Sequence, residues 1–183
     1  MLGLRGRQEG AAATVGSVTT TGSGELTPQD AAHLRTALRV AVEAKVAGKH
    51  PFGAIVVDGD GRVVVSRGNN ALPPDGDPTQ HAELLALSDA ARAIGVEEMR
   101  RATLFTSAEP CVMCTGAGYW TGVGRIVYAL SEVRLLELTG AHPENPTFSF
   151  PCREVLARGQ REVGVSGPHL EDEAAEPHVG FWV

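Results

Sequence analysis

The sequence predicts a three-layer α/β domain, an α-β-α sandwich in which helices cover both faces of a mixed five-stranded sheet. Several stretches place apolar residues at helical spacing, and short β-branched runs lie between them. An Asp-Gly-Asp-Gly turn at residues 58–61 joins two β-branched runs as a hairpin. The later runs alternate with helical stretches, which favours parallel strand pairs after the hairpin.

The helices are predicted from their end signals and their periodicity. Thr27 is suited to the N-cap of the first helix, Pro28 suits its first turn, and Gly48 can end it. The other helices are predicted over residues 79–94, from 109–111 onward, over 132–138 and over 152–158, with Gly95 and Gly159 ending two of them.

The strands are predicted from β-branched runs bounded by turn residues. They fall at residues 53–57, 63–65, 103–106, 125–128 and 161–166. Polar, proline-containing loops are expected at 69–79 and 143–151. Residues 1–25, rich in Gly, Ala, Thr and Ser, are expected to form a flexible tail, and residues 26–183 a single domain.

Composition excludes several classes of protein. The net charge of -6 argues against a nucleic-acid partner. No apolar run approaches the ~20 residues of a membrane span, and the start lacks the apolar centre of a secretory signal. Three cysteines do not make a disulfide framework, so we expect a cytoplasmic protein.

Two short motifs carry the predicted chemistry, and each stands at the start of a predicted helix. They are His81-Ala82-Glu83 and Pro110-Cys111-Val112-Met113-Cys114. The spacing of the two cysteines puts both thiols on one helical face, where the positive helix N-terminus favours thiolates. Zinc binds imidazole and thiolate, and three protein ligands leave a position for water, as in catalytic sites. We therefore predict one Zn²⁺ per chain, bound by His81, Cys111 and Cys114.

Glu83 is the predicted catalytic residue. It follows His81 closely enough to reach the water without binding the metal, and it can pass the proton to a leaving amine. The two motifs in this order match the signature of zinc base deaminases. Taken singly they leave other interpretations open, because a Cys-x-x-Cys pair can be a redox couple or part of a structural zinc site.

Residues 51–130 resemble the cytidine and deoxycytidylate deaminase superfamily, in the branch of guanine deaminase, fungal cytosine deaminase and the tRNA adenosine deaminases. The similarity lies in residues 51–54, 68–70, 77–83 and 109–114. It implies a cytidine deaminase-like fold, a homodimer, and the zinc and proton-carrying roles given above. It also implies a set of substrate-binding residues, namely Asn70, Phe52, Ala54, Ala82 and Trp120.

The substrate is expected to be a free nucleobase or nucleoside, of the guanine/guanosine or cytosine/cytidine type. Residues 69–70 and 118–120 look like guanine deaminase. That family reads the purine amino group with an Asp shortly after the strand at Tyr128, but the matching position here is Arg134, with Glu132 and Glu137 as the nearest acids.

The C-terminal segment is predicted to help close the substrate site. Its last 14 residues hold four acids and no Lys or Arg, and they include the pair Phe181-Trp182. We expect these rings to bind the substrate as a lid over a flat base, although they can instead dock on the core or on a partner subunit. Cys152 is expected to be an inert buried thiol. The histidines outside the motif, namely His33, His50, His142, His169 and His178, are expected at the surface or in loops.

Two alternatives are open. A tRNA-specific adenosine deaminase shares the motifs, but it needs a basic surface for the anticodon arm. A zinc-stabilised interaction subunit without activity is the other, and the unliganded carboxylate of Glu83 argues against it.

Overall fold

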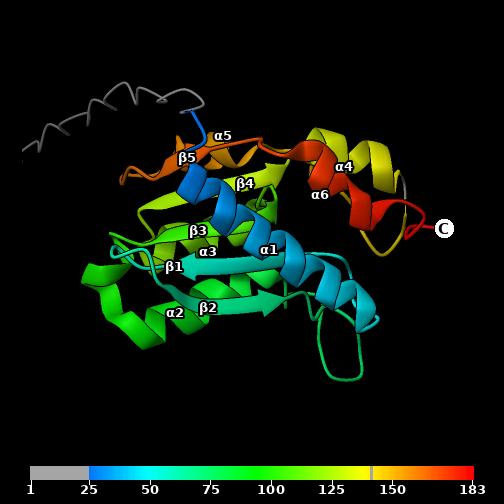
Figure 1. Cartoon of the computed structure of the whole chain (residues 1–183), viewed down its shortest axis with the longest axis horizontal. Coiled ribbons are helices and arrows are strands. Elements are labelled where there is room, and N and C mark those ends of the chain that lie inside the picture. The colour runs from blue at the N-terminus through cyan, green and yellow to red at the C-terminus, as the bar shows by residue number, and fades with distance from the viewer. Residues whose placement is uncertain (1–24, 141) are drawn as a thin grey trace, which may run out of the picture.

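The computed structural model describes residues 25–140 and 142–183, so nearly all of the predicted flexible tail lies outside the described residues. Its strands form one mixed sheet in the order β2-β1-β3-β4-β5 (Figure 1). β1 (Gly53–Val57) pairs antiparallel with β2 (Val63–Gly68) and with β3 (Thr103–Ala108). β4 (Arg125–Leu130) is parallel to β3, and β5 (Gly164–Ser166) is parallel to β4. The predicted mixed sheet with parallel pairs after the hairpin is confirmed.

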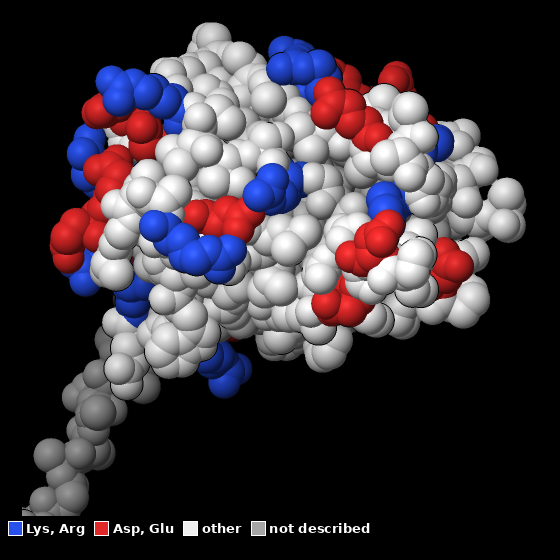
Figure 2. All heavy atoms as spheres, turned by 90° about the horizontal axis from the view of Figure 1, so that it is seen from below, with Lys and Arg blue, Asp and Glu red and all other residues white. Residues whose placement is uncertain are grey.

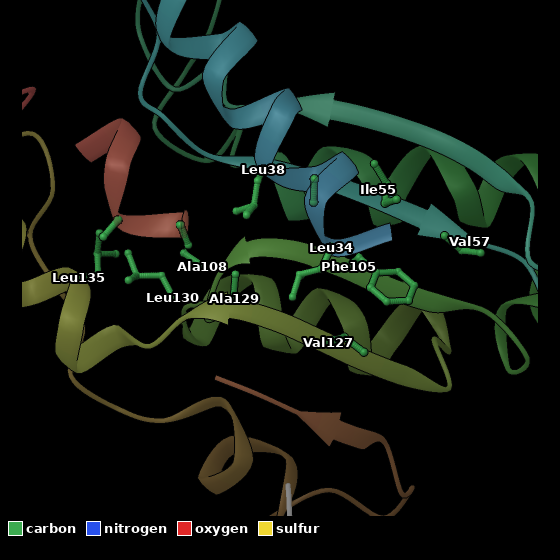
Figure 3. Packing of buried hydrophobic residues seen from close by; sticks show 13 residues of the cluster. Leu34, Leu38, Ile55, Val57, Phe105, Ala108, Val127, Ala129, Leu130 and Leu135 are labelled. Carbon is green, nitrogen blue, oxygen red and sulfur yellow. The ribbon is translucent and has the colours of Figure 1, made fainter. Parts of the chain in front are cut away.

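Helices cover both faces of this sheet, which confirms the three layers. In Figure 1, α1 (Pro28–Val46) crosses in front of the sheet, whereas α2 (Ala82–Met99) and α3 (Val112–Thr121) lie behind it. Alternate residues of each strand feed two separate cores, as the period of a strand requires. Ile55, Val57, Phe105 and Val127 pack under α1 (Figure 3), and Ala54, Val56, Leu104 and Ile126 pack against the other layer.

The remaining helices are short. They are α4 (Glu132–Thr139), α5 (Cys152–Leu156), α6 (Glu171–Ala175) and the 3₁₀ helix η1 (Glu176–His178). The sequence analysis did not predict α6 or η1. Their buried residues, among them Ala174 and Ala175, give too short an apolar signal to show helical periodicity. None of the helices in the described ranges is long and apolar enough to cross a bilayer.

One glycine fixes the contact between α1 and the sheet. A Cβ atom at Gly53 would lie 2.4 Å from the backbone nitrogen of Ala41 and 2.5 Å from the carbonyl oxygen of Ala37. Only glycine therefore lets α1 lie this close to the start of β1. This contact places residues 50–53 at the edge of the sheet where the site described next is found.

Candidate metal centre and substrate pocket

The three predicted metal ligands meet where α2 and α3 begin. His81 is the N-cap residue of α2 and Cys111 is the N-cap residue of α3, and neither side chain caps its helix. Cys114 lies in the first turn of α3. Because α2 packs against α3, one ligand atom from each of the three residues falls within 4.8 Å of the others, and the Cys111 Sγ lies 3.7 Å from the His81 Nδ1.

The three side chains shift one another's pKa values. The side-chain contact with Cys114, with that to His81 adding to it, lowers the pKa of Cys111 to about 4. The same contact and burial raise the pKa of Cys114. The contact with Cys111 raises the pKa of His81. One imidazole and two thiols at this spacing are the donor set that zinc prefers, so the residues present fit the ion.

Glu83 lies beside this cluster in a fully protein-enclosed position. Its Oε2 accepts a hydrogen bond from the Cys114 Sγ at 3.8 Å. Burial raises the pKa of Glu83, although the neighbouring His81 opposes the shift. A carboxyl group in this state holds a proton at a higher pH than an exposed glutamate does, which suits a residue that must accept and return a proton.

A cavity of about 750 Å³ opens over the cluster. It lies at the edge of the sheet where β2, β3 and β4 end and β1 begins. Its wall includes His81, Glu83 and Cys111 together with apolar side chains, among them Phe52, Leu72, Met113, Leu135 and Phe148. No Lys or Arg lines it within the described part of the chain, whereas four glutamates do: Glu83, Glu109, Glu132 and Glu144.

Three of these glutamates, Glu109, Glu132 and Glu144, were not predicted as site residues. Glu109 follows β3, and its carboxylate accepts hydrogen bonds from the backbone nitrogens of Glu132 at 3.2 Å and Cys152 at 3.0 Å. It thereby ties the first turns of α4 and α5 to the metal loop. Burial, with the negative charges of Cys111 and Glu109 adding to it, raises the pKa of Glu132 to about 7. Glu109 stands in the sequence motif and Glu132 directly follows a strand, but only the fold brings them to one wall.

The asparagine on the pocket wall is Asn69, whereas Asn70 was predicted. The amide nitrogen of Asn70 donates to the backbone oxygen of Asp75 and to the side chain of Gln80, so it holds its own loop together. Asn69 is buried and lines the cavity, and its Oδ1 accepts from the backbone nitrogen of Ala71. No acceptor for its Nδ2 is found in the described residues, which leaves this N–H group available to a ligand.

Of the other predicted substrate residues, one lines the cavity and three do not. Phe52 lines the cavity, as expected. Ala54 and Ala82 are core residues and do not line it. Trp120 is 84% exposed and contacts Tyr119 edge-on, outside the cavity. The physical reason is helical periodicity, because α3 buries Cys114 and Gly118 and thus turns Trp120 to the opposite side.

The C-terminal rings, predicted to bind the substrate as a lid, pack behind the cavity wall and do not line the cavity in this structure. Trp182 is 8% exposed, and its ring lies 5.1 Å from His50 and 6.1 Å from Phe52, both of which do line the cavity. Phe181 faces the Lys45 ammonium. The predicted alternative, docking on the core, is the arrangement in this structure. His50 and His178 are buried in the same cluster. His50 lies in a loop, as predicted, whereas His178 lies in η1 and not at the surface or in a loop.

Residues 143–148, the mouth loop, form the outer part of the wall. The loop is tied to the segment before β1 because the His50 Nε2 lies 3.1 Å from the Glu144 Oε2. Phe148 ends the loop at the rim and is 62% exposed.

Comparison with known proteins agrees with this site. Residues 27–130 match the family model described as the cytidine and deoxycytidylate deaminase zinc-binding region. The chain is 42% identical to a probable cytosine deaminase of Schizosaccharomyces pombe over 87% of this chain and 96% of that protein. It is 37% identical to a tRNA-specific adenosine deaminase of Haemophilus influenzae over 55% of this chain and 58% of that protein. The solved structure of a guanine deaminase from Nitrosomonas europaea superposes with a TM-score of 0.67 at 29% identity, over 83% of this chain and 82% of that one.

Metal analysis tests the ligand set. Purified protein is expected to carry one zinc per chain, and Cys111→Ser or Cys114→Ser is expected to lose it, because two ligands bind zinc too weakly to retain it. The matched control is Cys152→Ala, which removes the third, buried cysteine and should keep the metal. Retention of zinc by both ligand variants would contradict the assignment.

The docking of the C-terminal rings is expected to depend on pH through His178. The His178 Nδ1 accepts a hydrogen bond from the Trp182 Nε1 at 3.1 Å, and burial, with the Lys45 cation adding to it, lowers the pKa of His178 to about 4. An undocked His178 takes up a proton near its ordinary value of 6.5, so the stability of docking is present above that pH and is lost as the pH falls toward 4.

Fluorescence of Trp182 measures this loss. In a Trp120→Phe background, which removes the exposed tryptophan, the emission should shift to longer wavelength between pH 6.5 and about 4. His50 and His142 also face the Trp182 ring, so His178→Gln, which keeps an acceptor but does not titrate, serves as the control and should abolish the transition. An unchanged transition in that variant would assign it to another group.

Proposed function

Because the chain belongs to the cytidine and deoxycytidylate deaminase zinc-binding family, we propose that it is a zinc-dependent hydrolytic deaminase of a free nucleobase or nucleoside that releases ammonia. Cytosine is the first candidate substrate, since the relative named as a probable cytosine deaminase aligns over nearly its whole length. The observation that carries the proposal is the convergence of His81, Cys111 and Cys114 with the buried carboxyl group of Glu83.

His81, Cys111 and Cys114 are the residues that would hold the zinc ion. When bound, zinc supplies a Lewis acid that makes water nucleophilic at neutral pH. The chain's own contribution is to hold three donors in place from two helix starts beside the cavity.

Glu83 moves the protons. Its carboxylate would take one proton from the attacking water and deliver it to the ring nitrogen. It would then take the second proton from the new hydroxyl group and deliver it to the amine, which leaves as ammonia while the carbonyl group forms. Burial raises the pKa of Glu83, which favours the protonated state that the delivery step needs. Asn69, with a free amide N–H on the wall, is placed to orient a carbonyl oxygen of the base.

The cavity wall favours a flat substrate without a phosphate group. Apolar side chains such as Phe52, Leu135 and Phe148 suit a heteroaromatic ring. Four glutamates without a lining Lys or Arg repel an anion, which disfavours nucleotides and RNA. On the face shown in Figure 2, Lys and Arg lie beside Asp and Glu and do not gather into a basic field. These features favour a nucleobase or nucleoside over the anticodon arm that the tRNA alternative requires.

The proposal extends to the assembly and its location. We expect a homodimer in the cytoplasm, and the exposed ring of Trp120 on α3 is available for a subunit contact. The non-catalytic alternative leaves the buried Glu83 carboxyl group unexplained, because burying an ionisable group costs free energy that a purely structural site does not need.

Substitution of Glu83 tests the mechanism. Glu83→Gln is expected to keep its zinc but to lower kcat for ammonia release from cytosine by roughly 10²- to 10⁴-fold, because the amide cannot carry the proton. Glu137→Gln, a matched change at an exposed glutamate paired with Arg134, should leave kcat and the metal unchanged.

The outcomes separate two failures. Full activity of Glu83→Gln would place the proton carrier at another residue. A zinc-loaded wild-type protein that releases no ammonia from cytosine, guanine or their nucleosides would contradict the proposed function itself.

A further inference from the structure

We propose that Gln80 is a positioning residue, which fixes Asn69 on the cavity wall relative to the metal ligand His81. The inference rests on the proposed function and extends it to a residue outside the cavity. Gln80 directly precedes His81 and is half-buried, but it does not line the cavity. It is therefore not placed to contact a substrate, and any effect that it has on turnover must pass through its neighbours.

Two hydrogen bonds join the residue after Asn69 to the residue before His81. The backbone nitrogen of Asn70 donates to the backbone oxygen of Gln80 at 2.9 Å, and the Asn70 Nδ2 donates to the Gln80 Oε1 at 2.5 Å. The cavity residue and the metal ligand are thus each one peptide unit away from the same pair of hydrogen bonds. A shift between the two segments would move Asn69 relative to His81.

The other end of the Gln80 amide is held by Asp77. The Gln80 Nε2 donates to the Asp77 Oδ2 at 2.9 Å, and the backbone nitrogen of Gln80 donates to the backbone oxygen of Asp77, also at 2.9 Å. Hydrogen bonds from Thr79 hold the pKa of Asp77 below its ordinary value, so its carboxylate only accepts. Because the Nε2 must face Asp77, the Oε1 must face Asn70, and the network admits one orientation of the amide.

The same segment sets the side chain of Asn69. The backbone nitrogen of Asn69 donates to the backbone oxygen of Phe52 at 2.9 Å, and its Oδ1 accepts from the backbone nitrogen of Ala71 at 2.8 Å. The Ala71 N–H thereby holds the amide oxygen and leaves the Nδ2 for a ligand. Because Ala71 directly follows Asn70, release of Asn70 from Gln80 would also loosen the group that orients Asn69. A supported side chain of this kind binds a ligand at a lower entropic cost.

The loop between Asn70 and Gln80 has a second contact that does not involve Gln80. The Asn70 Nδ2 also donates to the backbone oxygen of Asp75 at 3.1 Å, and a Cβ atom at Gly76 would lie 1.7 Å from the Asn70 carbonyl oxygen. The loop therefore folds closely over Asn70 through its own backbone. A Gln80 variant keeps this packing and is expected to fold, so its effect on the site can be measured.

The test uses matched changes of glutamine. Gln80→Ala removes both side-chain hydrogen bonds. Gln80→Glu keeps an acceptor for Asn70 but sets a carboxylate against that of Asp77, and the added change Asp77→Asn restores a donor there. Gln29→Ala, at an exposed glutamine in the first turn of α1, is the control. Gln80→Ala is also combined with Asn69→Ala. Zinc content, kcat and KM for cytosine are measured for each protein.

Gln80→Ala is expected to raise KM for cytosine by about 3- to 10-fold with a smaller effect on kcat, because the hydrogen bond from Asn69 to the substrate is no longer preorganised. In the Asn69→Ala background the same change should have no further effect, since its effect passes through Asn69. Gln80→Glu should raise KM in the same way, and its combination with Asp77→Asn should return KM to within about twofold of wild type. Gln29→Ala should leave KM unchanged, and every variant should keep one zinc per chain.

Amide hydrogen exchange at Ala71 reports on Asn69 without any turnover. The Ala71 N–H, which donates to the Asn69 Oδ1, should exchange faster in Gln80→Ala than in the wild type. The Leu85 N–H, which donates to the backbone oxygen of His81 at 3.0 Å, should exchange as in the wild type, because the start of α2 is intact.

Several results would overturn the inference. They are an unchanged KM or an unchanged Ala71 exchange in Gln80→Ala, a wild-type KM in Asn69→Ala, and a full further loss when the two changes are combined. Loss of zinc from Gln80→Ala would also overturn it, because Gln80 would then serve the metal ligand and not Asn69. A wild-type protein that is inactive on every base, with faster Ala71 exchange in Gln80→Ala, would refute the proposed function and leave the positioning of Asn69 in place.

Discussion

The structure depends on the contact between the first turns of α2 and α3. These helices pack side by side on one face of the sheet, and their N-cap positions are filled by His81 and Cys111. Because both residues leave their side chains free of capping bonds, the helix starts present an imidazole and a thiol to the same point, and Cys114 adds the second thiol one turn later. Glu83 reaches this point because it lies in the first turn of α2. Any change that separates the two helix starts would dismantle the metal site and the proton carrier together.

The cavity beside this contact is lined by acidic residues. Four glutamates and no Lys or Arg line it within the described residues, which disfavours anions. Two of these glutamates also hold the wall together. Glu109 accepts a hydrogen bond from the backbone nitrogen of Glu132, and Glu144 contacts His50 and so ties the mouth loop to the segment before β1. The ring of Trp182 packs against His50 and Phe52 behind the cavity wall. The wall is thus built by segments far apart in the sequence, each anchored by a side chain.

The fold and the metal ligands were predictable because their signals are local. Strand alternation separates the two cores, and the spacing of Cys111 and Cys114 already implies one helical face. The pocket was less predictable. Asn69 and Asn70 are neighbours in one loop, and the conformation of that loop determines that Asn69 lines the cavity. Trp120 lies outside the cavity, and helical periodicity from Cys114 and Gly118 already indicates that it points outward. The positions of Trp182 and Glu132 depend on contacts between distant segments, which one sequence does not reveal.

The account claims that a zinc-bearing, acidic cavity deaminates an uncharged oxo-base. Ammonia release by the zinc-loaded wild-type protein from cytosine, guanine, adenine, cytidine, guanosine, cytidine monophosphate and an anticodon stem-loop, measured side by side, tests it most directly. We expect kcat/KM to be highest for an oxo-base or its nucleoside and undetectable for the nucleotide and the stem-loop. Preferred turnover of the stem-loop or of the phosphorylated substrate would contradict the account.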